Sequence, residues 1–381
     1  MADLAILAAL VACAGLAQAV AGYLAVRRFA ASPRLPVRRP RPVTILKPLH
    51  GAEPMLEQAL ASVCALQYGD YQIVFGTQNA ADPALAVVQA LRARFPGRDI
   101  AVVVDATPHG SNHKIANLIN MLPAAKHDVL VIADSDVHCA PDYLDRIVAA
   151  LETPGTGLVT TLYAGLAATA SLAGRLGAGW INASFLPGAL LARWLGRQDC
   201  LGATMALHRD TLDVIGGLAA LADHLADDFV LGALVRRQGL AVRLADTVPA
   251  TTVPEATLAK LFRHELRWAR TIRTLVPVQF VLSAVQYPLF WSALAVLLAG
   301  AAVWPLGLFL AAWAIRAAVA HGIDRALGLA NSGLATPTPI WLLPLRDIMS
   351  VIVILVSHGG DRVEWRGQVL HATPHRRASA T

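Results

Sequence analysis

The chain has 381 residues, of which 56% are hydrophobic and 15% are charged, with a mean hydropathy of +0.52. Because soluble proteins average about 25% charged residues, this composition excludes a disordered chain and an ordinary cytosolic enzyme, and it favours a soluble domain joined to membrane segments. The net charge is +6, but no interleaving of basic and aromatic residues indicates a nucleic-acid partner, and the four cysteines lack the spacing of a zinc site or disulfide framework.

The N-terminal region predicts a transmembrane anchor over residues 1–27 and a basic, proline-containing linker over residues 28–41. Residues 4–26 carry no charge, and at about 1.5 Å per residue they are long enough to cross a hydrocarbon core of roughly 30 Å. A cleaved signal peptide is less consistent with Asp3 and with the length of the apolar run. The arginines of the linker place this side in the cytoplasm by the positive-inside rule.

Residues 42–275 show short apolar runs that alternate with helical patterns. We predict strands at 43–46, 72–76, 100–104 and 129–133, and helices at 54–66, 83–95 and 113–122. This alternation predicts an α/β domain with a mostly parallel, doubly wound sheet. Such sheets bind ligands at the carboxyl ends of their strands. The groups that follow the apolar runs are Lys47, Asp82, the loop at 105–114, Asp134 and Asp136.

The segment Asp134-Ser135-Asp136 ends the last of these apolar runs. Because alternate residues of an extended chain point to the same side, both carboxylates face one way. Two carboxylates and a diphosphate supply the hard oxygen ligands of Mg²⁺ or Mn²⁺. The alternative is an Asx turn that caps the helix expected near Pro141.

A second acidic pair, Asp227-Asp228, precedes an amphipathic run at 229–237. The pair can cap this helix through the helix dipole. It can also hold a general base whose pKa is raised by the neighbouring carboxylate. Two further positions have the same double interpretation: Lys114 can contact phosphate or belong to a helix start, and Thr204 can approach a ligand or form part of a tight turn.

The segment at 264–268 reads HELRW and comes shortly before the C-terminal apolar region. Arg267 offers a rigid fork for phosphate, and Trp268 can stack or form a wall. The alternative is an interfacial amphipathic helix that holds both side chains at the level of lipid headgroups.

The last third predicts a transmembrane or re-entrant region over residues 276–358 and a basic cytoplasmic tail over residues 359–381. The candidate spans are 277–299, 301–320 and 340–357. The third contains Arg346 and Asp347, and charges inside a membrane are costly unless they are paired or face protein. Three crossings would separate the tail from a cytoplasmic domain, so we expect one of the three not to cross fully.

The order of these motifs is that of inverting family-2-type glycosyltransferases, and the chain most closely resembles the ceramide glucosyltransferase family. The shared stretches are 46–51, 82–84, 112–118, 134–136, 202–205, 226–229 and 264–268. Within this family the chain looks most like the bacterial hopanoid-biosynthesis branch, whose members move N-acetylglucosamine from a UDP donor to a hopanoid polyol. The resemblance implies that residues 42–275 form a GT-A glycosyltransferase domain.

The resemblance also implies a role for each matched aspartate. Asp82 lies near the nucleotide, Asp134 contacts the metal–UDP unit, and Asp228 is the proposed base. Asp136 completes a full DxD where some ceramide enzymes have only DxG, which favours a metal ligand there. Asp227 stands where Glu is usual.

Among the other matched residues, Arg267 and Trp268 belong to the (Q/R)xxRW motif, which closes over the diphosphate and the acceptor. His264 replaces the usual Gln or Arg of that motif. Lys47, Lys114 and Thr204 are expected to contact the nucleotide sugar, together with Asp227.

We therefore expect a multi-pass enzyme of the bacterial inner membrane, with its catalytic domain in the cytoplasm and with Mn²⁺ or Mg²⁺ as cofactor. It would move N-acetylglucosamine or glucose from a UDP donor to the hydroxyl of a hopanoid polyol or ceramide. A processive polysaccharide synthase is one alternative, because it shares DxD and (Q/R)xxRW, although it usually needs more membrane spans. A non-catalytic, lipid-binding membrane scaffold is the other.

Overall fold

The computed structural model describes residues 1–36, 40–300, 302–329, 333–360, 362–365 and 368–371. The chain divides into two compact units. The first, called the helical unit below, comprises Met1–Arg28, Thr169–Leu191 and Glu255–Thr381. The second, called the sheet unit, comprises Phe29–Ala168 and Ala192–Pro254. The stretches 169–191 and 255–275, which lie inside the predicted domain at 42–275, thus belong to the helical unit.

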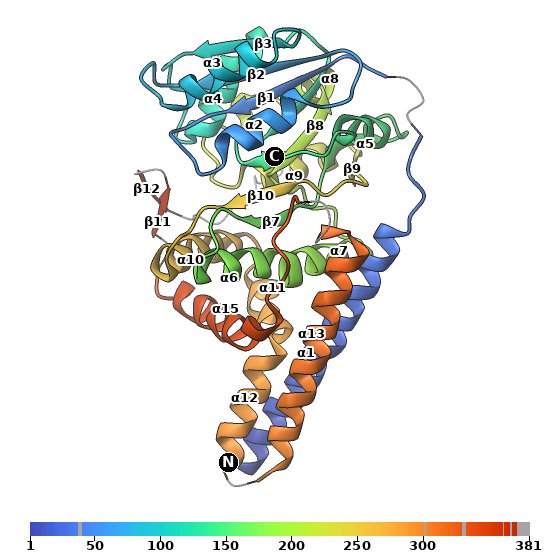
Figure 1. The fold of residues 1–381 in the computed structure, drawn as a ribbon, viewed down its shortest axis with the longest axis vertical. Helices are drawn as coiled ribbons and strands as arrows, with labels where there is room; N and C mark the ends of the chain where they lie inside the picture. The colour runs from blue at the N-terminus through green and yellow to red at the C-terminus, as the bar shows by residue number, and fades with distance from the viewer. Residues whose placement is uncertain (37–39, 301, 330–332, 361, 366–367, 372–381) are drawn as a thin grey trace, which may run out of the picture. The chain divides into compact units, whose positions relative to one another are not determined.

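The sheet unit is built on a seven-stranded sheet with the strand order β3-β2-β1-β4-β8-β6-β9 (Figure 1). Its strands are β1 (Val43–Pro48), β2 (Tyr71–Thr77), β3 (Asp99–Val104), β4 (Val129–Ala133), β6 (Thr156–Thr160), β8 (Thr204–His208) and β9 (Ala241–Leu244). Strands β3, β2, β1 and β4 are parallel, β8 runs antiparallel to β4 and β6, and β6 is parallel to β9. A smaller sheet joins β5 (Val137–His138), β10 (Ala250–Val253) and β7 (Ala164–Ala167).

Helices cover both faces of the large sheet. They are α2 (Leu56–Cys64), α3 (Ala84–Arg94), α4 (His113–Met121), η1 (Leu122–Ala124), α5 (Tyr143–Leu151), α8 (Arg209–Val214), η3 (Leu218–Leu221) and α9 (Asp227–Arg237). Successive strand residues point to opposite faces, so Ile45 belongs to one apolar cluster with Leu60 of α2, and Leu46 belongs to another with Ile115 of α4. The predicted α/β class is confirmed, and the seven elements predicted within this unit are found with bounds shifted by no more than two residues.

The helical unit contains most of the long apolar helices. Its elements are α1 (Ala2–Ala30, which ends in the sheet unit), α6 (Leu172–Trp180), the π-helix η2 (Ile181–Phe185), α7 (Leu186–Trp194, which also runs into the sheet unit), α10 (Leu258–Leu275), α11 (Pro277–Leu282), η4 (Ser283–Gln286), α12 (Pro288–Ala299), α13 (Trp304–Ala326), η5 (Ile340–Leu342), α15 (Leu343–Ser357), β11 (Arg362–Trp365) and β12 (Gln368–His371). The last two strands pair as an antiparallel hairpin.

Three helical segments of the described chain are long and apolar enough to cross a membrane: Ala2–Ala30, Trp304–Ala326 and Ile340–Ser357. The predicted span at 277–299 is bent by 68° between Pro277–Gln286 and Pro288–Ala299, and counts as a fourth only if this pair is one span. Pro288 accounts for the break, because proline lacks the N–H of a helix interior. Arg38 and Arg39 of the predicted linker, and Arg366, Arg376 and Arg377 of the predicted tail, lie outside the described residues.

The charges of the third predicted span, at 340–357, are paired inside the helical unit. The guanidinium of Arg346 forms two hydrogen bonds of 2.7 Å with the two carboxylate oxygens of Glu265 on α10. Asp347 accepts a hydrogen bond from Arg316 of α13 at 3.3 Å and another from the backbone N–H of Leu289 at 3.1 Å. Pairing of this kind is the condition under which charges are tolerated at such positions.

Replacing Arg346 by Met should destabilise the protein by about 3–5 kcal/mol, because the carboxylate of Glu265 is then left buried without a partner. The free energy of unfolding of the detergent-solubilised protein measures the effect. Arg263→Met is the matched control, since Arg263 is an exposed arginine on α10, the helix that carries Glu265. Adding Glu265→Leu to Arg346→Met should restore much of the loss; an equally unstable double variant would contradict the pairing argument.

Candidate active site

The acidic turn after β4 is held by a buried lysine on the neighbouring strand β1. The ammonium of Lys47 donates hydrogen bonds to the carbonyls of Asp134 at 2.7 Å and Val137 at 3.1 Å. The backbone N–H of Asp134 donates to Ala203, just before β8. Lys47 has no exposed surface, so its ammonium contacts the turn itself, and its predicted contact with the nucleotide sugar stays a prediction.

Lys114, at the start of α4, joins the two acidic pairs. Its Nζ lies 2.6 Å from Asp134 Oδ1 and 3.7 Å from Asp227 Oδ2. Burial lowers the pKa of Lys114, but the charges of Asp134 and Asp227 outweigh it and hold this pKa above its ordinary value. The helix itself is capped by Asn112, whose side chain accepts a hydrogen bond from Ile115 N. The side chain of Lys114 therefore contacts carboxylates, and Asn112 caps the helix.

Asp136 is the second carboxylate of the DxD segment. Its Oδ2 accepts a hydrogen bond from the hydroxyl of Thr251 at 2.5 Å. Burial and the negative charge of Asp134 raise the pKa of Asp136 to about 6. A carboxyl group whose ionisation is hindered by a neighbouring carboxylate is a natural place for a cation, which would favour its charged form.

The chemistry of the donor set fits a divalent cation that also binds substrate. No group of three or more His, Cys, Asp or Glu side chains suited to a metal occurs among the described residues. A cation at Asp134 and Asp136 would thus take its other ligands from a diphosphate and water. Mg²⁺ in proteins is bound in this way, by one or two carboxylates together with substrate phosphates.

Asp227 and Asp228 are the first two residues of α9. Asp228 Oδ1 accepts a hydrogen bond from Phe229 N at 2.7 Å. Burial, and then the charge of Asp227, raise the pKa of Asp228 to about 7. Gly202 leaves the room for this carboxylate, because a Cβ there would lie 3.0 Å from Asp228 Oδ2. The carboxylate thus sits at a helix start and also has the raised pKa that suits a general base.

Asp82 follows β2, on the same sheet edge as the end of β4. Both of its carboxylate oxygens lie 3.0 Å from the backbone N of Gly51, and it also accepts from Ala84 N at 2.9 Å and Thr77 Oγ1 at 3.1 Å. Burial raises the pKa of Asp82, but these hydrogen bonds outweigh it and hold the pKa below its ordinary value. Asp82 therefore stays ionised and fixes the loop after β1 against α3.

Thr204 lies in the core, so its predicted contact with the nucleotide sugar stays a prediction, and Tyr163 is a candidate site residue that the sequence analysis missed. Thr204 has no exposed surface, and its hydroxyl is 2.8 Å from that of Tyr143, so its contact lies within the core. Tyr163, which no motif marked, follows β6. Burial raises its pKa, and so do the charges of Asp228, Asp134 and Asp136 in turn, which places the phenol near all three carboxylates. Ligand-binding groups often follow the carboxyl ends of strands. This rule selected Asp82, and it could also have selected Tyr163.

His264, Arg267 and Trp268 lie on α10, in the helical unit. The rings of His264 and Trp268 meet edge to face with centroids 4.5 Å apart, and His264 Nδ1 pairs with Glu255. Trp180 of α6 lies beside Trp268, with ring centroids 5.8 Å apart. The carboxylates belong to the sheet unit, so the expected closure of Arg267 and Trp268 over the diphosphate and the acceptor stays a prediction.

The mixed sheet, with long apolar helices toward both chain ends, defines an α/β protein with candidate membrane spans. The family model for glycosyl transferase family 21 matches residues 6–378, and the chain belongs to this family. It is 22% identical to ceramide glucosyltransferase 1 of Caenorhabditis elegans over 250 residues, which are 64% of this chain and 52% of the relative. It is 32% identical to ceramide glucosyltransferase of Komagataella phaffii over 113 residues, 29% of this chain and 22% of the relative. The chain thus covers about half or less of these relatives' length.

Among solved structures, a mannosyltransferase from Pyrobaculum calidifontis in complex with GDP-Man and Mn²⁺ aligns with a TM-score of 0.49 and 19% identity, over 92% of this chain and 99% of the other. Glucosyl-3-phosphoglycerate synthase from Mycobacterium tuberculosis, in complex with Mn²⁺, UDP and phosphoglyceric acid, aligns with a TM-score of 0.41 and 19% identity, over 62% and 79% of the two chains.

The raised pKa of Asp228 should make stability fall as pH rises. A carboxyl whose folded pKa is about 7 and whose ordinary value is 3.8 holds its proton more tightly when folded, so its stabilising contribution is present below pH 4 and is lost between pH 4 and 7. Asp228→Asn should therefore be more stable relative to the natural protein at pH 7.5 than at pH 4.5, as measured by unfolding midpoints. Asp213→Asn, at an exposed position, is the control; identical pH profiles for all three proteins would refute the shift.

Proposed function

We propose that this chain is a membrane-anchored inverting glycosyltransferase that moves a sugar from a UDP donor to the hydroxyl of a lipid. The observation that carries the proposal is the pair of linked carboxylate clusters at one sheet edge, in a chain of glycosyl transferase family 21. Asp134 and Asp136 offer ligands for a diphosphate-bound cation. Asp228 offers a base with a pKa of about 7.

The reaction would be a single displacement at the anomeric carbon. The lipid hydroxyl attacks this carbon on the face opposite UDP, while the carboxylate of Asp228 takes the hydroxyl proton; the bond from the sugar to the diphosphate oxygen breaks, and UDP leaves with the electron pair. A positioned base of this kind typically contributes about 10²–10⁴-fold. A cation held by Asp134 and Asp136 would stabilise the charge on the leaving diphosphate.

The lysines have separate tasks in this scheme. Lys47 keeps the backbone of the acidic turn in place through two carbonyl groups. Lys114 offsets part of the negative charge of Asp134 and Asp227, which limits the negative potential that an anionic donor meets. Arg267 and Trp268 are proposed to close over the donor, as the family motif implies.

The apolar helices would hold the reaction at a bilayer. Moving the apolar body of a lipid into water costs about 25 cal/mol per Å², so an enzyme anchored in the membrane needs to draw out only the polar end of its acceptor. The arginines after the first helix favour a cytoplasmic sheet unit, and the resemblance to the bacterial hopanoid branch favours a bacterial inner-membrane location. The relatives' names favour glucose and ceramide, whereas the sequence resemblance favours N-acetylglucosamine and a hopanoid polyol.

Asp228→Asn should lower transfer by about 10²-fold or more while UDP-sugar still binds, because the amide cannot accept the hydroxyl proton. Release of UDP and labelling of lipid by radioactive sugar measure turnover, and donor binding is measured separately by calorimetry. Asp213→Asn serves as the matched control. Near-normal turnover of Asp228→Asn would remove this residue as the base.

Chelation should stop the reaction, because the leaving diphosphate then loses its counter-charge at Asp134 and Asp136. Dialysis against EDTA followed by UDP-release assays checks this, with Mn²⁺ or Mg²⁺ added back to restore activity. Asp136→Asn should require a higher concentration of added metal. Full activity in EDTA would leave the two carboxylates with a structural role.

The sugar and acceptor can be identified from cells with and without this chain. Mass spectrometry of total lipids should show one glycolipid class that disappears with the gene and returns with it, but not with the Asp228→Asn variant. A labelled polymer in the aqueous phase would instead favour a polysaccharide synthase. Unchanged lipids and no UDP release in vitro would favour a non-catalytic scaffold.

A further inference from the structure

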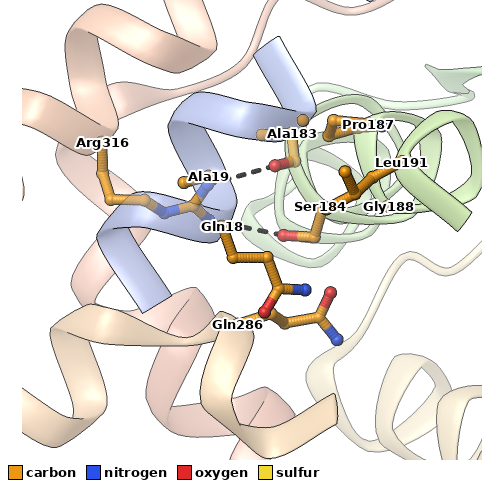
Figure 2. Close-up of a pocket in the computed structure, with 10 residues that line it drawn as sticks. Gln18, Ala19, Ala183, Ser184, Pro187, Gly188, Leu191, Gln286 and Arg316 are labelled. Atoms are coloured by element: carbon orange, nitrogen blue, oxygen red, sulfur yellow. Dashed lines mark hydrogen bonds between the residues drawn. The ribbon is translucent and has the colours of Figure 1, made fainter. Parts of the chain in front are cut away.

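The helical unit contains a small polar pocket between α1 and α13, lined among others by Gln18, Gln286 and Arg316 (Figure 2). The guanidinium of Arg316 donates there to the carbonyl of Ala183 at 3.1 Å and to the hydroxyl of Ser184 at 3.4 Å. The pocket has a volume of about 20 Å³, which is room for about one water molecule. It is thus too small for a substrate, and the polar contacts that bear on the reaction lie in the sheet unit.

The loops that lead into α4 and α9 meet in the sheet unit. The backbone N–H of Asn112, just before α4, donates to the carbonyl of Ala222 at 2.8 Å. Gly110, at φ +93°, permits this close approach, because a Cβ there would lie 2.7 Å from the carbonyl oxygen of Ala222. The loop before Lys114 therefore lies directly against the loop before Asp227.

The side chain of Asn112 forms hydrogen bonds with both of these segments. Its Oδ1 accepts from Ile115 N at 3.1 Å, which caps α4. Its Nδ2 donates to the carbonyl of His224 at 2.7 Å, in the loop before the second acidic pair. Only 2% of Asn112 is exposed, so little solvent competes for these bonds. One amide thus connects the helix that carries Lys114 with the loop that leads to Asp227.

The amide of Asn112 also acts on the charges of this region. Burial raises the pKa of Asp227, and the ammonium of Lys114 and the amide of Asn112 both act against this rise. Asp227 Oδ2 is buried without a hydrogen-bond partner among the described residues, and it lies 3.7 Å from Lys114 Nζ. Because the energy of two charges depends on their separation, the placement of α4 against α9 sets the charge that Asp228 experiences.

We propose that Asn112 is a positioning residue, whose amide holds Lys114 and the Asp227–Asp228 pair in the arrangement that transfer requires. Ser or Asp would cap α4 equally well, because each offers an acceptor oxygen. Neither has the N–H group that reaches the carbonyl of His224, so Asn serves the loop of the acidic pair as well as the helix. Misplacing the pair costs turnover, since a base acts at hydrogen-bond distance from the proton that it takes. The proposal rests on the proposed function only for the role of Asp228 as the base.

The test compares variants that keep the cap and lose the donor. Asn112→Ser removes the amide, and in Asn112→Asp an oxygen faces the carbonyl of His224, so the two oxygens repel each other. Asn117→Ser is the matched control. Asn117 also lies on α4, is 4% exposed and donates to the carbonyl of Gly76 at 2.8 Å. The control thus loses the same kind of buried hydrogen bond, but one that does not involve the loop at 222–226.

We expect kcat for UDP release with a lipid acceptor to fall at least about tenfold in Asn112→Ser, and further in Asn112→Asp, relative to Asn117→Ser. The dissociation constant of the donor, measured by calorimetry, should stay within about threefold of the natural protein, because the turn that carries Asp134 and Asp136 is unchanged. If Asn112 only caps α4, kcat in both variants will equal that of Asn117→Ser, and the proposal is overturned.

Hydrogen exchange of the full-length protein in detergent gives a second readout that needs no turnover. Backbone amides at 222–228 should exchange at least about tenfold faster in Asn112→Ser than in Asn117→Ser, because this loop has lost a connection to α4. Unchanged exchange, or faster exchange with unchanged kcat, would refute the positioning role. Faster exchange in a protein whose natural form shows no transfer would support the contact of Asn112 with the loop and refute the proposed function.

Discussion

The sheet unit depends on two ammonium groups, those of the buried Lys47 and the partly buried Lys114, which hold several carboxylates close together. Lys114 links Asp134 to Asp227, and Lys47 fixes the backbone of the turn that carries Asp134. Carboxylates from distant parts of the chain would otherwise repel one another at close range. The ammonium of Lys114 offsets part of this repulsion.

The surroundings of the acidic groups also give them different pKa values. Hydrogen bonds to Asp82 keep it ionised, whereas burial and neighbouring charge raise the pKa of Asp136 to about 6 and of Asp228 to about 7. Pairs of titratable groups with separated pKa values often mark an acid–base division of labour. Here it separates Asp82, which hydrogen bonds keep ionised, from groups suited to metal binding and proton transfer.

In the helical unit, buried charge is also balanced pairwise, by Arg346 with Glu265 and by Arg316 with Asp347. Glu265 lies inside the HELRW segment, so this pairing fixes the helix that carries Arg267 and Trp268. The composition of 340–357 indicated that its charges needed partners, but not which partners, because α10 and α13 are distant in sequence.

The sequence by itself determined the α/β class, the positions of seven strands and helices of the sheet unit, and the strand-end location of Asp82, Asp134 and Asp136, because hydrophobic periodicity and turn residues are local properties. Only the tertiary structure decided what each polar group touches. In the folded chain Lys47 and Thr204 are buried, and Lys114 contacts two carboxylates. The charges of the aspartates act on Tyr163, and a polar pocket lies between α1 and α13. Such contacts join residues far apart in the chain, and no local pattern encodes them.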